Sequence, residues 1–544
     1  MVFNPALNLQ AFATPSANEA PPSINAIYLR DGRYDGMTRA DVAATFAAFR
    51  EQTATDRLAL FFHGGLVDKV TGQKEGANSY DNYANIVFPL FFIWESGIWE
   101  VLAHHLPLVF AETIFGRIVS HATDLISSKI PQYGPEAGQV VLLEAALNLP
   151  NAGAEKIEVT SADIDAFMTA IKNDEAIQQE AVAIARTSNS VDTLLAPTAT
   201  TDSFQLSPRT YLSPDVVGAI RGAYVQANRT NLSSEQPLAA IPLDIGGAIQ
   251  AAWAIAKAAV PVIVNSVKRL VAKRDHGITC TIVEEVLRAL YLANTGSSIW
   301  EEMKRETEDA FGLDSNLYGG TAVIEELCMH LKQKPSTPIT LVGHSTGAIY
   351  IGNFLRHVDI ALRAQGDTTT VFDIILMAPA STMDFFTSSY TSRVRGIRMF
   401  QMKDATEQQD HLMSADFGPE DPSILGKVYP RSLLYLVSGI CEYFEGQGGS
   451  GPHGLDGDDM PILGMDRFFE QTAVFSLADY ASVGQARSEF AVAPPTIPTK
   501  CVRVISPTAT TPNDGYRSTA EKHGNFPGDQ PTIESIRVCF QQGL

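Results

Sequence analysis

The residues with the clearest chemical potential form the sequence Gly343-His344-Ser345-Thr346-Gly347. This sequence follows an apolar run, residues 339–342, and precedes a helical pattern. A serine at a sharp strand-to-helix turn presents its hydroxyl at the end of a sheet, and glycines two residues away on either side remove Cβ atoms that would clash there. We therefore predict that Ser345 is a nucleophile. A glycine-punctuated turn with an idle serine is the alternative.

The chain around Ser345 alternates between apolar runs and helical patterns. The apolar runs read as buried strands, and they cover residues 24–29, 58–65, 87–94, 339–345, 372–381, 397–404 and 501–507. Helical periodicity occurs between and after them, at residues 38–52, 321–332, 348–365 and 532–540. A mostly parallel central sheet flanked by helices explains this order, so the predicted fold class is α/β.

Two segments interrupt this alternation. Residues 97–320 show helical periodicity and no convincing strand, and residues 407–498 form a smaller irregular insertion. We expect one decorated domain, in which residues 1–96 and 321–544 form the core and residues 97–320 form a large, mainly helical lid or cap. This cap should lie above the carboxyl edge of the sheet, where loops build substrate pockets. Four tryptophans could line such a pocket or fill the core, namely Trp94, Trp99, Trp253 and Trp300.

The setting of Ser345 resembles the α/β-hydrolase superfamily, most closely its serine esterase and lipase-like members. The resemblance covers the two sheet-forming segments, about half of the residues. It implies an α/β-hydrolase fold and an oxyanion hole made by two backbone N–H groups, one after the third strand and one after the nucleophile. The sequence HGG ending at Gly65 follows an apolar strand, so the implied donors are Gly65, or Leu66, together with Thr346. Leu66 departs from the HGGG form of the family, because it replaces the third glycine.

The resemblance also places the catalytic base last in chain order. His523 matches this position, since it lies in a loop after a late apolar strand and just before the final helix. A neutral imidazole there can accept the Ser345 proton and return it to the leaving group. A solvated loop histidine is the alternative. His63 is expected to stabilise a turn, and His344 is expected to be structural or to line the pocket.

A catalytic acid must hold the imidazole tautomer and stabilise the imidazolium. It should follow a strand that lies between Ser345 and His523 in the sequence. Asp404 comes directly after such a strand, and we predict it as the acid. Three other carboxyl groups, which would otherwise be solvated caps, remain open as alternatives: Glu407, Asp410 and Asp384.

Composition excludes several classes of function. With 45% hydrophobic and only 19% charged residues, the 544-residue chain is suited to a globular core. Its net charge of −21 repels phosphate backbones and anionic headgroups, so we expect no nucleic-acid partner. The five cysteines are far apart and form no CxxC pattern, which predicts neither a disulfide scaffold nor a zinc site and favours a reduced compartment.

Stable membrane insertion is not expected either. The N-terminal residues show no secretory signal pattern, so we expect a cytoplasmic protein. Residues 245–264 form an apolar stretch, but Gln250, Lys257 and Pro261 interrupt it. We therefore favour a buried or lid helix over a membrane span.

Two weaker patterns bear on cofactors and metals. Residues 446–451 satisfy GxGxxG literally, but they open no helix and are predicted to be a flexible loop. Asp456, Asp458 and Asp459 lack the spacing of a calcium loop and are predicted to form a solvated face. We expect no cofactor and no metal.

Together these features predict a serine hydrolase that cleaves carboxylic esters of a fairly apolar small molecule through an acyl-enzyme. Ser345 attacks, His523 acts as base and then acid, and Asp404 orients it. Gly65 and Thr346 stabilise the oxyanion. Two alternatives remain open: an amidase or thioesterase with the same triad, and a non-catalytic, membrane-associated binding protein that uses residues 245–264 as its anchor.

Overall fold

The computed structural model describes most of residues 25–544. The residues that it leaves out are 1–24, 65–68, 96–105, 107–108, 130–157, 187–209, 229–244, 292–294, 391–392, 411–428, 443–458, 473, 475–480, 494, 496–498 and 509–514.

The centre of the fold is a nine-stranded sheet with the order β2-β1-β4-β3-β5-β6-β7-β9-β8. Its strands are β1 (Ala26–Arg30), β2 (Arg33–Tyr34), β3 (Leu58–Phe62), β4 (Phe88–Glu95), β5 (Ile339–His344), β6 (Phe372–Met377), β7 (Val394–Met402), β8 (Phe490–Val492) and β9 (Cys501–Ser506). Every neighbouring pair is parallel except the antiparallel pair β1 and β2. The predicted α/β class with a mostly parallel sheet is therefore confirmed. The strands β2 and β8 were not predicted, because runs of two and three residues show no readable period.

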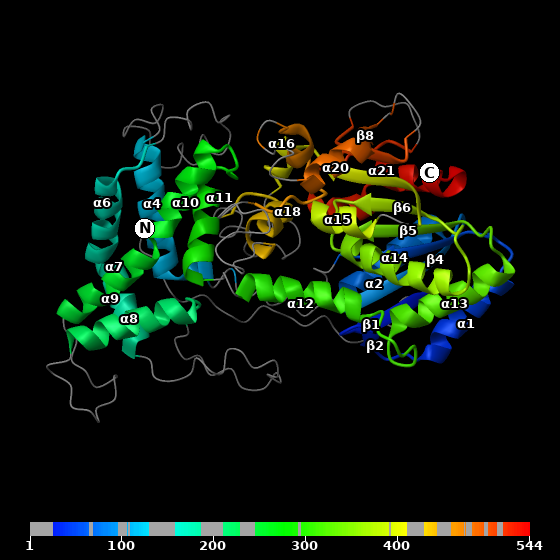
Figure 1. Ribbon diagram of the computed structural model, residues 1–544, viewed down its shortest axis with the longest axis horizontal. Helices are drawn as coiled ribbons and strands as arrows, with labels where there is room; N and C mark the ends of the chain where they lie inside the picture. Colours follow the sequence, from blue (N-terminus) through cyan, green and yellow to red (C-terminus); the bar gives the residue numbers. More distant parts are fainter. Residues whose placement is uncertain are drawn as a thin grey trace.

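Helices cover both faces of the sheet (Figure 1). The helices that follow or flank the strands are α1 (Arg39–Glu51), α2 (Lys69–Tyr83), α13 (Gly319–Gln333), α14 (Gly347–Ala364), α15 (Met383–Ser389) and α21 (Gln530–Gln542). Successive side chains of a strand point to opposite faces, which decides the layers. Phe61 packs on Tyr83 of α2 and Phe540 of α21, whereas Phe62 packs on Tyr350 of α14.

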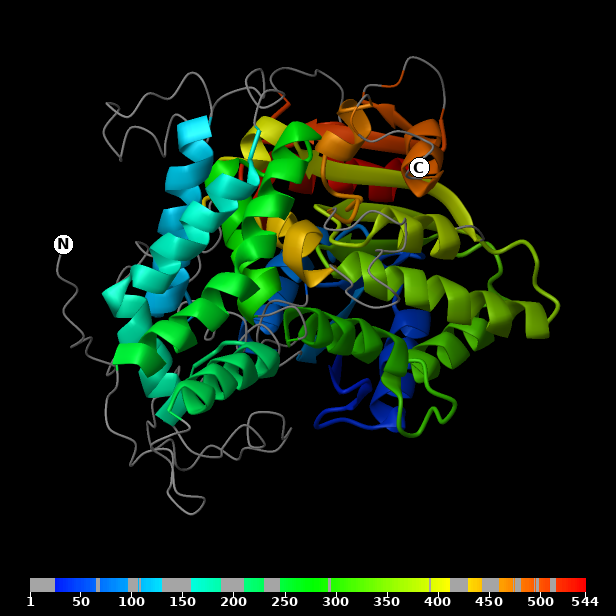
Figure 2. The same cartoon turned by 60° about the vertical axis from the view of Figure 1, so that its left-hand side comes forward.

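The described part of residues 97–320 contains helices and no strand. These helices are α4 (Thr113–Lys129), α6 (Ser161–Asn173), α7 (Glu175–Arg186), α8 (Pro214–Ala227), α9 (Ile245–Ala258), α10 (Val260–Val271), α11 (Ile278–Val286), the π-helical turn η5 (Leu287–Tyr291) and α12 (Thr295–Asp309). Most of them form a bundle beside the sheet, and α12 runs from the bundle toward α14 (Figures 1 and 2). The bundle is joined to the carboxyl end of β4 through residues outside the described ranges.

The predicted second insertion, between β7 and β9, contains several short elements in its described part. They are α16 (Asp404–Glu407), α18 (Leu433–Leu436), the π-helical turn η6 (Val437–Cys441), α19 (Arg467–Glu470) and α20 (Ala481–Glu489), followed by β8. The element α18 lies between the helical bundle and the sheet in both views (Figures 1 and 2). This second insertion therefore bridges the two halves of the molecule.

The apolar stretch at residues 245–264 falls within α9 and α10. Among the described residues, one helical stretch, Ile245–Val271, is long and apolar enough to cross a membrane, and 44% of its most apolar window is buried. Its α9 half packs against α6, α7 and α8 of the bundle.

The three described tryptophans belong to the hydrophobic core or pack against it. Trp94 and Trp300 are 3% and 1% exposed, and the Trp300 indole N–H donates to Glu442 Oε1 at 2.6 Å. The half-buried Trp253 lies near the amines of two lysines, Lys172 and Lys257. The fourth, Trp99, is outside the described residues.

Candidate active site

The candidate residues gather at one edge of the sheet. Because β3, β5, β6, β7 and β9 are parallel, their carboxyl ends meet at the same edge. His63 follows β3, Ser345 follows β5 and Asp404 follows β7. The loop after β9 reaches His523. Ser345 lies near the centre of this row, since β5 is the middle strand of the nine.

Ser345 occupies a strained turn between β5 and α14. Its φ is 54°, in the left-handed region that residues with a side chain rarely adopt. Backbone hydrogen bonds hold it there, because its N–H donates to Met377 O at 2.9 Å and its carbonyl accepts from Ala380 N at 3.0 Å. Strain of this kind persists only where the surroundings fix it, and it often marks a functional position.

The two glycines of the turn are required by close packing. A Cβ at Gly347 would lie 2.1 Å from Phe62 O, the last carbonyl of β3. A Cβ at Gly343 would lie 2.8 Å from Ile351 Cδ1 and 2.9 Å from the carbonyl carbon of Gly347. The G-x-S-x-G spacing therefore lets α14 start directly against β3.

The Ser345 side chain is enclosed. It is 2% exposed, and its hydroxyl has no hydrogen-bond partner among the described residues. A Cβ added to Gly64 would lie only 3.2 Å from Ser345 Cβ, so the segment after β3 passes directly beside the serine. This arrangement brings the HGG sequence and the G-x-S-x-G sequence together.

The backbone of His523 is fixed from both sides. His523 begins the 3₁₀ turn η7 (His523–Gly528), and its N–H donates to Asp410 Oδ2 at 2.7 Å. Its carbonyl accepts a hydrogen bond from His344 Nε2 at 3.0 Å. The His344 and His523 rings are 5.3 Å apart. His523 is therefore held beside the residue that precedes Ser345.

The His523 ring has the protonation state that a base requires. The residue is 8% exposed, and neither ring nitrogen has a hydrogen-bond partner among the described residues. Burial, and to a smaller extent the neighbouring His344, lowers the pKa of His523 well below its usual value. The imidazole is therefore neutral near pH 7, with a lone pair free to accept a proton.

The carboxylate of Asp404 is hydrogen-bonded to residues other than His523. Its Oδ1 accepts from the Tyr435 hydroxyl at 2.5 Å, and its Oδ2 accepts from the side-chain amides of Gln408 and Gln471 at 2.9 and 3.3 Å. Asp410 is the carboxylate that contacts His523, through the backbone N–H. Within the described chain, the predicted Asp404–His523 hydrogen bond is not formed.

The other two candidate acids have different surroundings. Glu407 is fully buried, and burial, with the nearby charges of Asp410 and Asp404, raises its pKa well above the usual value. Burial therefore favours the protonated form of this carboxyl group. Asp384 lies in the first turn of α15, which follows β6.

Of the two predicted oxyanion donors, only Thr346 lies within the described residues. It is fully buried and is the N-cap of α14, where the helix dipole is positive. A developing negative charge on a neighbouring oxygen would be stabilised there. Gly65 and Leu66 lie outside the described residues, one and two positions after Gly64.

His63 is a structural residue, in agreement with its expected turn-stabilising role. Its Nδ1–H donates to Gly64 O at 2.6 Å, and its Nε2 accepts from the Trp94 N–H at 3.1 Å. Burial lowers the pKa of His63 to about 4, so the ring is neutral. With both nitrogens bonded, His63 ties the end of β3 to β4. His63 and His344 also line a small cavity.

A buried ionic cluster was missed by the sequence analysis. Asp459 was expected on a solvated face, but it is 1% exposed and lies 2.6 Å from the Arg269 guanidinium. It belongs to a group with His276 and Glu284 whose side-chain atoms are of the types that bind metal ions. The available signal was the presence of charged residues in the apolar helices α10 and α11, including Arg269 and the pair Glu284-Glu285.

The remaining motif predictions lie outside the described residues. They are the GxGxxG match at residues 446–451 and the acidic residues Asp456 and Asp458. All five cysteines are described, and each is free and buried, so the chain forms no disulfide.

Comparisons of the chain with protein-family models, with curated proteins and with solved structures found no match. The fold itself defines an α/β protein with a mostly parallel, helix-covered sheet.

Proposed function

We propose that this chain is a serine hydrolase with an α/β-hydrolase fold, and that it cleaves carboxylic esters of a fairly apolar small molecule. The observation that carries the proposal is the pair formed by Ser345 and His523. A serine with positive φ and an unbonded, buried hydroxyl lies at the carboxyl edge of a parallel sheet. A neutral histidine with two unbonded ring nitrogens is anchored to its neighbour His344.

A purely structural role for Ser345 and His523 explains these features less well. A buried hydroxyl or imidazole without a hydrogen bond costs free energy, roughly 1–3 kcal/mol for each group. Left-handed backbone at a serine adds about 1–2 kcal/mol. Three such costs concentrated at one sheet edge are typical of a site where strain and unbonded groups serve a reaction.

The proposed acid is Asp410 rather than Asp404. Asp404 is already bonded to Tyr435, Gln408 and Gln471, whereas Asp410 Oδ2 accepts from the His523 N–H. Asp410 was one of the alternatives that the sequence left open. In the proposal, Asp410 accepts a hydrogen bond from the His523 ring in the substrate complex, where catalytic hydrogen bonds tighten.

The proposed reaction has two steps. Ser345 Oγ attacks the ester carbonyl while a ring nitrogen of His523 takes the hydroxyl proton, and His523 then returns that proton to the departing alcohol. The N–H of Thr346, together with that of Gly65, would stabilise the negative oxygen of each tetrahedral intermediate. Water then attacks the acyl-enzyme with His523 again as base, and the acid is released.

The expected substrate is apolar because the helical bundle joins the sheet at the carboxyl end of β4, on the same edge as Ser345. A helical bundle over an ester-hydrolysing site would resemble the lid of a lipase, which covers an apolar substrate. Esters with long or aromatic acyl groups should therefore be turned over faster than acetate esters.

Hydrolysis of p-nitrophenyl esters by the Ser345→Ala variant tests the proposal. We expect turnover to fall by at least about 10³-fold while circular dichroism is unchanged, because alanine adopts the same backbone angles. Ser482→Ala is the matched control, since it also removes a buried hydroxyl without a described partner, but from α20. Equal turnover in wild type and Ser345→Ala would refute the proposal. Matched ester and anilide substrates distinguish an esterase from an amidase.

A further inference from the structure

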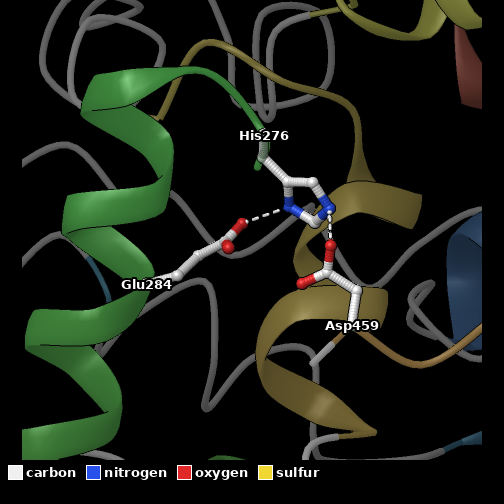
Figure 3. A group of neighbouring side chains, drawn as sticks. All are labelled: His276, Glu284 and Asp459. Carbon is white, nitrogen blue, oxygen red and sulfur yellow. Dashed lines mark hydrogen bonds and ion pairs between the residues drawn. The ribbon is translucent and has the colours of Figure 1, made fainter. Parts of the chain in front are cut away.

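The two insertions meet in a buried ionic cluster, and Figure 3 shows three of its side chains, those of His276, Glu284 and Asp459. We define the His276 cluster as His276, Arg269, Glu284, Glu285, Arg288 and Asp459. The first five residues come from the helical bundle, and Asp459 comes from the insertion between β7 and β9. All six side chains are at most 4% exposed. Charges buried so deeply are tolerated only when they are paired.

His276 joins two carboxylates. Its Nδ1 forms a hydrogen bond with Glu284 Oε1 at 2.6 Å, and its Nε2 lies 2.7 Å from Asp459 Oδ2. Figure 3 shows the imidazole between the two acidic side chains. The contact with Asp459 is at ion-pair distance but lacks the geometry of a hydrogen bond. An ionised carboxylate has no proton to donate, so a ring with a proton, and therefore a positive charge, at both nitrogens suits the two acidic neighbours best.

Arginines complete the pairing. Arg269 Nη2 lies 2.6 Å from both Glu284 Oε2 and Asp459 Oδ1, and its Nη1 lies 3.0 Å from Glu285 Oε1. Arg288 Nη1 lies 2.5 Å from the same Glu285 oxygen. Three carboxylates therefore face two guanidinium groups, and one further positive charge makes the cluster neutral.

The pKa values of the Glu284 and Asp459 carboxyl groups agree with this pairing. Burial alone would raise the pKa of Glu284, but the charges of His276 and Arg269 lower it to about 2. Burial acts in the same way on Asp459, and the charges of Arg269 and His276 lower its pKa below the usual value. Both groups are therefore negative near pH 7.

A bound divalent cation is the competing explanation. A metal ion would take the lone pair of one His276 nitrogen, and the N–H of the other nitrogen could donate to only one of the two carboxylates. The metal would also have to displace Arg269, which already binds the oxygens of Glu284 and Asp459. The arginine fills the place of a cation, so the contacts favour an imidazolium.

The cluster reaches the candidate active site through Tyr435. The His276 and Tyr435 rings meet edge to face at 4.5 Å, and the Tyr435 hydroxyl donates to Asp404 Oδ1 at 2.5 Å. Asp404 and Asp410 are the two ends of a short run of helical turns. Two backbone hydrogen bonds hold this run together, from Gln408 N to Asp404 O and from Asp410 N to Thr406 O. Asp410 in turn accepts from the His523 N–H.

We propose that His276 is a doubly protonated imidazolium that clamps the helical bundle to the second insertion, and that this clamp positions the Asp404–Asp410 turn that holds His523. His276 is a positioning residue, because it contacts neither Ser345 nor His523. The positioning half of the proposal rests on the proposed function, whereas the protonation state does not.

The charged and titratable groups around the His276 cluster come from every element packed against it. Glu284 from α11, Tyr435 from α18 and Asp459 contact His276 directly. The other charged or titratable groups contact or lie near these residues and their neighbours: Glu285 and Cys280 from α11, Arg269 from α10, Arg288 from η5, Arg467 from α19, Asp404 from α16, and Tyr429, Arg431 and Asp275 from the connecting segments. Burial alone would lower the pKa of Arg467, but its electrostatic interactions with Asp404, Asp459 and Asp275 raise it.

Nuclear magnetic resonance of protein labelled with ¹⁵N-histidine tests the protonation state. At pH 7.5 an ordinary imidazole is about nine-tenths neutral. We expect one ring with both nitrogens protonated at this pH, whose signals disappear in His276→Gln. A neutral His276 ring would overturn the clamp. A Zn²⁺-dependent rise in Tm that occurs in wild type and not in His276→Gln would also overturn it, in favour of a metal site.

A comparison of His276→Gln with His121→Gln tests the positioning. His121 lies 3.0 Å from Asp174 Oδ2 within the bundle, but it is partly exposed, which makes it a matched control. We expect His276→Gln to lower Tm by about 5 °C or more, because it leaves the buried cluster with three carboxylates and only two guanidinium groups. For the remaining folded enzyme at 20 °C, kcat on a p-nitrophenyl ester should fall about tenfold with an unchanged KM. His121→Gln should alter neither value.

The possible failures are distinguishable. An unchanged kcat in folded His276→Gln refutes the positioning, even if Tm falls. An unchanged Tm refutes the clamp. If wild type hydrolyses no ester, the proposed function fails, and the resonance and Tm measurements still decide the clamp.

Discussion

Substitution of Gly347 by alanine tests the packing that forms the serine turn. In the structure, a Cβ at this position would lie 2.1 Å from Phe62 O, 2.9 Å from the carbonyl carbon of Phe62 and 3.3 Å from His63 O. These are backbone atoms of a central strand, so no side chain can rotate to relieve the overlap. The start of α14 must move away from β3 by about 1 Å for the new carbon to reach a separation of 3.0 Å.

The expected effect has two parts. Overpacking of this kind costs about 1–3 kcal/mol of unfolding free energy, because the strand and helix are buried on both sides. The movement also shifts Ser345, which is two residues earlier. A misplacement of about 1 Å at a reacting group reduces the rate by about 100-fold.

The two effects are measured separately. Urea denaturation followed by circular dichroism gives the loss of stability, and ester hydrolysis gives the loss of rate. Gly218→Ala in α8 is the matched control, because a Cβ there meets nothing within 4 Å. This control should gain up to about 1 kcal/mol of stability from helix propensity, with no change in rate. A Gly347→Ala protein as stable as wild type would contradict the packing that we describe.

Three further predictions concern charge and burial. Asp410→Asn should lower ester turnover by about 100-fold or more, whereas Asp404→Asn should lower it by about tenfold or less; the reverse order would restore Asp404 as the acid. Stability to urea should fall as the pH drops below about 6.5, because the lowered pKa values of buried His63 and His523 mean that the unfolded chain binds protons that the folded chain does not. His63, with a pKa of about 4, accounts for up to about 3 kcal/mol of this loss, and His63→Gln should flatten the profile. A thiol reagent such as Ellman's should react with less than one cysteine per folded chain and with all five in guanidinium, because all five thiols are buried. Burial raises the pKa of the Cys328 thiol and raises the pKa of the other four to about 11 or 12. Rapid labelling of the native protein would show instead that a thiol is accessible.

Local patterns predicted the framework of the fold. Each predicted strand corresponds to a strand of the sheet, and the predicted helices correspond to α1, α13, α14 and α21. This success has a physical cause, because the buried strands of a parallel sheet are continuous apolar runs and the covering helices are amphipathic. The G-x-S-x-G sequence could be placed because its turn is built from residues that are adjacent in the chain.

Contacts between distant segments could not be predicted in the same way. Asp410 and His523 are 113 residues apart, and which of several nearby carboxylates faces the histidine depends on the turns after β7. Asp459 was expected to be solvated because a run of acidic residues is hydrophilic by itself. Its partner Arg269 lies 190 residues earlier, in an apolar helix, and their pairing removes both charges from water.

The most direct test of the account is to identify the residue that a fluorophosphonate labels. We expect one label per chain on wild-type protein, located by peptide mass spectrometry on Ser345. The label should be absent from Ser345→Ala, strongly reduced in His523→Gln and retained in Ser482→Ala. No labelling of folded wild-type protein, or a label on another serine, would contradict the assignment of Ser345 as the nucleophile.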